Sequence, residues 1–184
     1  SYRLVGSEMC IRDRKKDITK TKMAIGLMLV LPRIPQLLYG TEILMEDSSN
    51  PGDHGLIRSD FPGGWDNDKI NAFSKQNLTD DQIEMQEYLK VLLNFRKKSK
   101  AIHIGNTIHF APKNGVYLLQ RRYNDEIVIF IINKNKNDVR LSNDRFSELN
   151  LNNIVFSDIH SGKKFSFSKT LKLKSNSSYI LKSN

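Results

Sequence analysis

The sequence is poor in cysteine, tryptophan and proline, which number one, one and five among its 184 residues. A single cysteine, Cys10, excludes a disulfide framework within the chain, so a folded core has to be held by packing. The longest apolar run, residues 23–31, ends at Pro32 and is far shorter than the roughly 20 residues that span a bilayer. The length nevertheless allows one or two domains with a sizeable core.

Acidic residues are scarce in the last part of the chain. The net charge is +9, and residues 104–184 carry thirteen basic groups against six acidic ones, while the remainder is nearly balanced. No nucleic-acid-binding motif and no interleaving of aromatic and basic residues accompanies the excess. We therefore expect a solvated basic sheet surface and no nucleic-acid partner. The lysines that carry much of the excess are Lys163, Lys164, Lys169, Lys172, Lys174 and Lys182.

Four lysines before the apolar run 23–31 imitate a signal peptide, but no small-residue cleavage site follows them. We expect a buried helix over residues 18–31, ended by Pro32. Residues 4–14 fit no helical or strand period and spell the translation of a transposon-type sequencing adapter. On this interpretation residues 1–14 are not native, Cys10 belongs to the adapter, and the N-terminal majority of the reading frame is missing.

The middle of the chain predicts a short buried strand, a long loop and a helix. Leu37, Leu38 and Tyr39 suit a buried strand, and residues 41–75 form a loop of a length that usually serves a function. Thr79 and Gln82 frame a capping box that begins the helix. Apolar residues at helical spacing predict its buried stripe, namely Met85, Tyr88, Leu89, Leu92 and Phe95.

After Ser99 the apolar pattern changes to period two, which predicts strands. Asn114-Gly115 is a strong hairpin signal, and Asn124-Asp125 is a second candidate. Short strands at this spacing favour an antiparallel β-sandwich. The expected strands are residues 102–110, 116–123, 126–133, 139–141, 154–158, 164–167, 170–173 and 178–181.

Two segments carry a resemblance to a known family. Residues 34–43 read Ile-Pro-Gln-Leu-Leu-Tyr-Gly-Thr-Glu-Ile, and residues 52–65 read Gly-Asp-His-Gly-Leu-Ile-Arg-Ser-Asp-Phe-Pro-Gly-Gly-Trp. They resemble the eighth barrel strand and following loop of α-amylase-type enzymes, glycoside hydrolase family 13, in the neopullulanase/cyclomaltodextrinase-like branch. The chain departs from the common pattern at Pro32-Arg33 and at Leu38, positions that concern packing.

The resemblance implies an α/β plus all-β fold: the last α/β units of a (β/α)8 TIM barrel, followed by an antiparallel β-sandwich domain. The expected domains are residues 1–14 (adapter-derived), 15–99 (the end of the barrel: helix 7, strand 8, rim loop, helix 8) and 100–184 (β domain). Such enzymes cleave α-glucosidic bonds of starch-like substrates with retention, using carboxylates after the fourth, fifth and seventh strands. All of these precede Lys15, so the chain is expected to contain no catalytic residue and to be inactive as a fragment.

The rim loop at the barrel mouth is the expected substrate-binding site. The resemblance assigns it Arg58, Asp60, Phe61 and Trp65. Trp65 stacks on a glucose ring in one interpretation and plugs a self-packed loop in the other, and the sequence leaves both open. His54 has no partner at ligand spacing, so no metal is expected, and no cofactor is implied. The branch includes periplasmic enzymes; any signal peptide is expected upstream of this chain.

Three functions are considered: part of an α-glucan hydrolase, a non-catalytic starch-binding module, and a basic binder of acidic surfaces. The first is the interpretation that the resemblance favours. A barrel strand without its neighbours leaves both edges unpaired. Residues 15–98 are therefore expected to aggregate alone, whereas residues 100–184 are expected to fold independently.

Overall fold

The computed structural model describes residues 17–45, 59–151, 154–167 and 170–184. Its contacts divide the chain into two compact units. The first contains the described residues of Ser1–Thr21 and Gln36–Leu89, and the second contains Lys22–Pro35 and those of Lys90–Asn184. The boundaries fall inside two helices, so each unit includes parts of both. The adapter-like segment 1–14 lies outside the described residues.

Helix α2 spans Ile18–Val30 and confirms the helix predicted from the apolar run. Asp17 precedes it and accepts a hydrogen bond from the Lys20 amide at 3.1 Å, which satisfies one of the free donors of the first turn. The helix turns an apolar surface inward, and its buried residues are Met23, Ile25, Gly26, Leu29 and Val30.

None of the helices in the described part of the chain has the length and apolar character that crossing a membrane requires.

The strand predicted at Leu37–Tyr39 is absent from the described chain: Leu37 and Leu38 have no regular structure, and Tyr39 lies in a turn where the Thr41 amide donates to the Leu38 carbonyl at 3.2 Å. A strand is defined by the hydrogen bonds of its neighbours, and the described chain offers none at this point. Gly40 follows with φ of +83°, and the 3-10 helix η1 spans Thr41–Ile43. A side chain on Gly40 would collide with Met45, since a Cβ built there lies 2.5 Å from Met45 Sδ and 2.8 Å from Met45 Cβ.

Helix α3 spans Asp80–Lys98, as the capping box predicted. The Thr79 amide donates to Gln82 Oε1 at 2.9 Å, and the Gln82 amide donates to Thr79 Oγ1 at 3.3 Å. The first turn is acidic and the last turn is basic, which suits the helix dipole at both ends. The capping box and the charged helix ends both depend on residues close together in sequence. This is why the sequence pattern could predict the helix, and the prediction is confirmed.

A short helix, α4 (Lys100–Ile104), occupies the start of the strand predicted over residues 102–110. The Ser99 hydroxyl caps it by accepting from the Ile102 amide at 3.3 Å. The Glu126 carboxylate accepts from the Ser99 hydroxyl at 2.5 Å and from the Ala101 amide at 3.0 Å. A residue 25 positions away thus fixes α4, and that contact could not be read from the local period.

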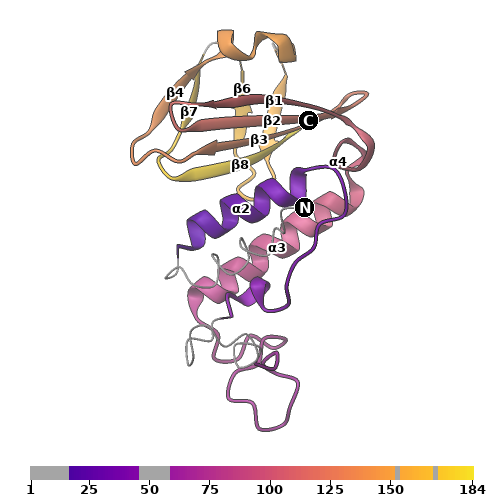
Figure 1. Ribbon diagram of the computed structural model, residues 1–184, viewed down its shortest axis with the longest axis vertical. Coiled ribbons are helices and arrows are strands. Elements are labelled where there is room, and N and C mark those ends of the chain that lie inside the picture. The colour runs from indigo at the N-terminus through magenta and orange to yellow at the C-terminus, as the bar shows by residue number, and fades with distance from the viewer. Residues whose placement is uncertain (1–16, 46–58, 152–153, 168–169) are drawn as a thin grey trace, which may run out of the picture. The chain divides into compact units, whose positions relative to one another are not determined.

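The remaining strands form one antiparallel sheet of six in the order β1-β2-β3-β8-β5-β6, together with the pair β4-β7. In Figure 1, β1, β2, β3 and β8 lie side by side in this order. The hairpin at Asn114-Gly115 is confirmed: it joins β1 to β2, and both residues have positive φ. The turn at Asn124-Asp125 joins β2 to β3. The bounds are β1 Asn106–Lys113, β2 Val116–Tyr123, β3 Glu126–Asn133, β4 Val139–Ser142, β5 Val155–Asp158, β6 Lys164–Ser166, β7 Thr170–Leu173 and β8 Ser177–Ser183.

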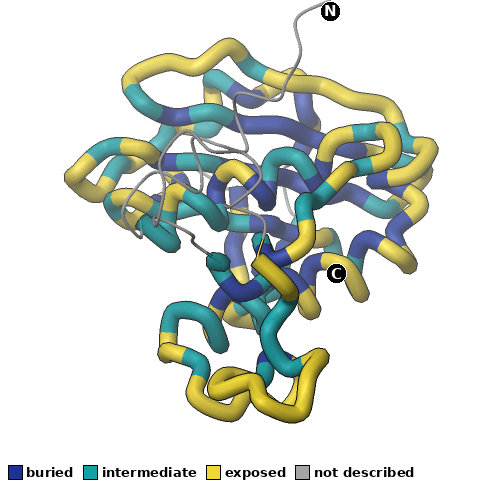
Figure 2. Tube along the Cα trace, turned by 60° about the horizontal axis from the view of Figure 1, so that its bottom comes forward, coloured by how far each residue is buried: buried dark blue, intermediate teal, exposed yellow. Residues whose placement is uncertain are grey.

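The large sheet is buried on both faces, as the dark-blue positions along its central strands show (Figure 2). One face carries Leu118 and Ile129 and packs on the β4–β7 pair and on the 3-10 helix η2 (Asn143–Leu149), which contributes Phe146 and Leu149. Helix α4 packs against β2 and β3. The β-sandwich part of the predicted fold is thereby confirmed. The described strand pairs are all antiparallel, so these residues do not display a barrel, which stays a prediction.

Candidate functional site

The rim loop comprises residues 41–75, of which the structure describes residues 41–45 and those from Ser59 onward. One carboxylate holds the turn that follows Ser59. Asp68 Oδ2 accepts from the Gly63 amide at 2.6 Å and from the Trp65 amide at 3.1 Å. Gly63 has a φ of +102°, and a Cβ there would lie 2.7 Å from Asn71 Oδ1. Charge-assisted bonds to two amides make Asp68 the anchor of this turn.

A second side chain holds the other half of the loop. Asn71 Oδ1 accepts from the Phe73 amide at 2.9 Å and from the Ser74 amide at 3.0 Å, which is the pattern of an Asx turn. The backbone amide of Asn71 donates to the Gln76 carbonyl at 3.0 Å. From α3, Gln86 Nε2 donates to the Ala72 carbonyl, also at 3.0 Å. The loop is therefore ordered by its own side chains and tied to α3, as binding loops on a scaffold are.

The predicted site residues differ in how the structure presents them. Trp65 is 69% exposed, which does not fit the interpretation of Trp65 as a plug inside its own loop. Phe61 is half-buried, and its ring lies 5.5 Å from that of Phe73, which is itself 74% exposed. Asp60 is exposed. Arg58 and His54 lie outside the described residues.

The described part of the loop presents exposed side chains that suit recognition. Exposed aromatic rings can stack on the apolar face of a sugar, and a carboxylate such as Asp60 can accept bonds from its hydroxyls. The described residues contain no group of three or more histidine, cysteine or acidic side chains placed to hold a metal ion.

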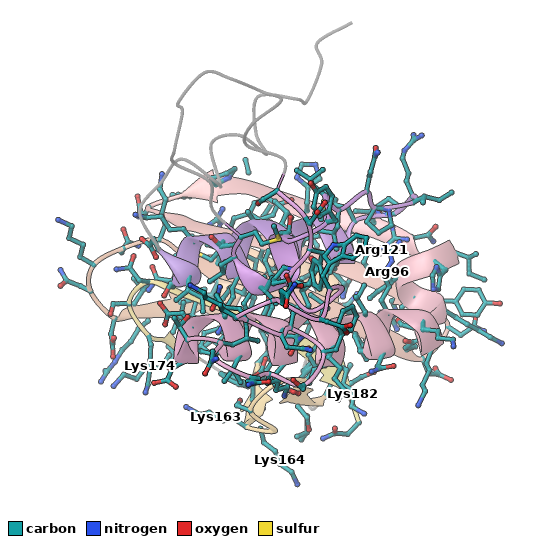
Figure 3. All side chains as sticks on the ribbon, turned by 90° about the horizontal axis from the view of Figure 1, so that it is seen from below. Arg96, Arg121, Lys163, Lys164, Lys174 and Lys182 are labelled. Carbon is teal, nitrogen blue, oxygen red and sulfur yellow. The ribbon has the colours of Figure 1, made fainter. Side chains whose placement is uncertain are left out.

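Two arginines are buried in the second unit, at places that the sequence did not single out (Figure 3). Arg96 is 6% exposed, and its guanidinium donates to the Leu29 carbonyl, to the Leu31 carbonyl at 3.2 Å and to the Arg33 carbonyl at 2.5 Å. Arg121 is 1% exposed and donates to the Ile102 carbonyl at 2.8 Å and to Thr107 Oγ1. Leu29 and Ile102 lie in the last turns of α2 and α4, and Leu31 and Arg33 follow α2, so the arginines bind carbonyls at helix C-terminal ends, where a cation is favoured.

Burial lowers the pKa of the Arg96 guanidinium, and burial together with the Arg96 charge lowers the pKa of Arg121. Neither arginine forms a salt bridge with an acidic side chain within the described ranges. Both are structural cations whose only partners there are neutral oxygens. By contrast, Lys163, Lys164, Lys174 and Lys182 are exposed and extend outward from the ribbon, as expected of a solvated basic surface (Figure 3).

The second unit also contains a pocket of about 330 Å³ on the inner face of the large sheet. Its floor comes from the ends of β1 and β2, and one side comes from η2. Most of its side chains are polar, and nothing in the sequence pattern marked them as a group. The lining residues are Asn106, Ile108, Gln120, Arg122, Asn124, Glu148 and Leu149.

Comparisons with known proteins agree with this architecture. Residues 107–182 match the profile of the cyclo-malto-dextrinase C-terminal domain. The α-amylase of Niallia circulans is 26% identical over 116 residues, which cover 63% of this chain and 18% of that protein. This chain therefore spans less than a fifth of that relative's length.

Solved structures share the fold at low sequence identity. A variant of AmyP in complex with maltotriose has a TM-score of 0.68 and 17% identity, and the alignment covers 90% of this chain and 34% of that one. The α-amylase of Geobacillus thermoleovorans, complexed with acarbose, has a TM-score of 0.61 and 23% identity over 95% of this chain and 35% of that one. By sequence and by fold the chain is therefore similar to α-amylases, and its residues 107–182 match a cyclo-malto-dextrinase C-terminal domain.

Proposed function

We propose that this chain is part of a retaining α-glucan hydrolase that cleaves α-glucosidic bonds in starch-like substrates. The observation that carries the proposal is the match of residues 107–182 to a cyclo-malto-dextrinase C-terminal domain. Further support comes from the structural alignments with AmyP and with the α-amylase of Geobacillus thermoleovorans, which extend over 90% and 95% of this chain.

In the proposed reaction, one carboxylate attacks the anomeric carbon while a carboxylic acid protonates the leaving oxygen. Water then hydrolyses the covalent glycosyl intermediate, with the second group now acting as base. These groups are supplied by sequence outside this chain, as the family resemblance implies. The role of the chain is to bind substrate at the rim loop through Arg58, Asp60, Phe61 and Trp65, and to support the barrel through the β domain.

The test uses a longer protein in which sequence upstream of this chain completes the barrel. Proton NMR of early products from maltotriose or a cyclodextrin is expected to show the α-anomer first, because two inversions retain configuration. The 184-residue chain alone is expected to release no reducing sugar. Hydrolysis by the 184-residue chain, or β-anomer from the longer protein, would contradict the proposal.

The loop residues are tested in the same longer protein. Trp65→Ala removes the exposed ring, and we expect kcat/KM to fall about tenfold, with most of the loss in KM, if the ring stacks on substrate. Phe73→Ala is the matched control, since Phe73 is an equally exposed aromatic residue of the same loop that is not among the proposed contacts. Equal losses in the two variants would assign the effect to loop stability instead of substrate contact.

A further inference from the structure

The pocket on the inner sheet face is built by the register of β1 and β2. Ile108 pairs with Gln120, and Asn106 pairs with Arg122, so the side chains of these four residues share one face. Asn124 lies in the turn that follows, and Glu148 comes from η2. The pocket thus belongs wholly to the second unit. Its volume is within the range of about 300–1,000 Å³ that small-molecule sites occupy.

Gln120 is the buried polar group of this pocket. Its side chain is 1% exposed, and among the residues that the structure describes its Nε2 atom has no hydrogen-bond partner. An unpaired buried amide costs about 1–3 kcal/mol, so native proteins rarely leave one without a water or a ligand. Gln120 is one of the residues that line the pocket, so its amide lies next to the space that a ligand would fill. This points to a bound molecule that offers an oxygen.

The other lining groups define the chemistry of that molecule. Arg122 and Glu148 carry opposite charges, so the pocket favours neither an anion nor a cation strongly. Asn106 and Asn124 add amides that can both donate and accept. Ile108 and Leu149 supply apolar surface between the polar groups. Paired donors and acceptors around a small apolar surface suit a neutral ligand with several hydroxyl groups.

We propose that this pocket binds a neutral saccharide, a glucose unit of an α-glucan, with Gln120 as the buried anchor and Asn106, Arg122 and Glu148 at the rim. The pocket is a non-catalytic site on the β domain. The choice of an α-glucan among neutral polyols rests on the proposed function. The pocket itself rests on the geometry of β1, β2 and η2 and does not involve the rim loop.

Isothermal titration calorimetry of the 184-residue chain with maltotriose tests the proposal. We expect binding in the millimolar range that weakens at least about tenfold in Gln120→Leu, which removes the amide but keeps the side chain similar in size. Asn106→Ala, at an exposed rim position, is expected to weaken binding severalfold. The matched control is Asn137→Ala, which removes an exposed amide at the opposite end of β3 and should leave binding unchanged.

Circular dichroism checks the fold of each variant; if Gln120→Leu does not fold, Asn106→Ala and Glu148→Ala decide the matter, because both residues are exposed. No heat of binding with maltotriose, or binding that these variants do not change, overturns the proposal. Binding of sorbitol as tight as that of maltotriose overturns the assignment to a glucan. If the longer protein fails to hydrolyse glucans while Gln120-dependent binding persists, the hydrolase proposal fails and the pocket stands.

Discussion

At the scale of single residues, the buried arginines of the second unit satisfy backbone carbonyls and have no acidic partner among the described residues. Arg96 binds three carbonyls at and after the end of α2, and each bond involves a charged donor. We expect Arg96→Met to lower the free energy of unfolding by about 3 kcal/mol, because it leaves carbonyls such as that of buried Leu29 without a donor. Urea denaturation followed by circular dichroism measures the change.

The neighbour Lys97 is exposed in the same turn of α3 and provides the control. Lys97→Met should change the unfolding free energy by less than about 0.5 kcal/mol. Arg96→Lys should recover part of the loss, since an ammonium can reach fewer carbonyls at once than the planar guanidinium. Similar midpoints for Arg96→Met and Lys97→Met would show that the carbonyl bonds contribute little.

His160 makes stability depend on pH. Burial lowers the pKa of its imidazole; the Asp158 carboxylate opposes this shift, and the Lys22 ammonium reinforces it. The folded chain therefore binds this proton less readily than the unfolded chain, whose histidine titrates near pH 6.5. The contribution of neutral His160 is complete above that pH and is lost as the pH falls below it.

We expect the melting temperature to fall between about pH 7.5 and about pH 5.5, and to fall less in His160→Gln, which cannot gain the proton. The other histidines are present in both proteins and cancel from the comparison. Differential scanning calorimetry at both pH values gives the two decreases. An equal decrease in the two proteins would exclude His160 as a source of the acid sensitivity.

At the scale of elements, two turn glycines with similar backbone conformation differ in their surroundings. Gly115 has a φ of +73°, and a Cβ there would lie 2.4 Å from Asn135 Oδ1, whereas Gly162 has a φ of +68° and nothing within 4 Å. Alanine is destabilised by about 1–2 kcal/mol in this left-handed backbone conformation at both positions. Gly115→Ala is expected to cost about 1 kcal/mol more, because it also displaces the Asn135 side chain.

Asn135 is not free to move away. Its Nδ2 donates to the Asn114 carbonyl and to Asn133 Oδ1, both at 2.8 Å. Chemical denaturation of the two glycine variants and a double-mutant cycle with Asn135→Ala measure the coupling. A zero interaction energy in that cycle, or equal costs at Gly115 and Gly162, would refute this account of the turn.

The elements also show what the sequence could predict. Helix α3 and the hairpin at Asn114-Gly115 depend on neighbouring residues, so capping and turn patterns located them. Helix α4 depends on Glu126, far away in sequence, and the expected strand at 37–39 depends on pairing that the described chain lacks. The same limit applies to the sites. A distinctive loop sequence pointed to Trp65, whereas Gln120 reads as an ordinary strand residue until the register places it beneath η2.

At the scale of the whole molecule, the two units differ in how they are stabilised. The second has a continuous apolar core across a six-stranded sheet, with strands such as β3 buried along most of their length. The rim loop of the first is ordered mainly by exposed hydrogen bonds, including those of Asp68 and Asn71. Amide hydrogen exchange reports this difference in stabilisation, because local opening that breaks only a few exposed hydrogen bonds costs little free energy.

We expect amides of β2, β3 and β8 to exchange through global unfolding, and amides of residues 59–78 to exchange orders of magnitude faster. Hydrogen-exchange mass spectrometry at increasing urea concentrations distinguishes the two groups, because only global opening accelerates strongly with denaturant. Equal protection of the rim loop and β3, lost in one sharp transition, would show that the chain unfolds as one cooperative body.

For the whole chain, exposed apolar side chains predict self-association. Ile34 is 96% exposed, in a segment where the sequence predicted burial in a barrel. Large exposed apolar groups promote contact between copies, so Ile34→Lys is expected to lower the association of the 184-residue chain in light scattering. Val155→Lys, at a position 43% exposed on β5, adds the same charge and should have a smaller effect. Equal effects would assign the change to net charge, because both variants gain one positive charge and only one removes a fully exposed apolar side chain.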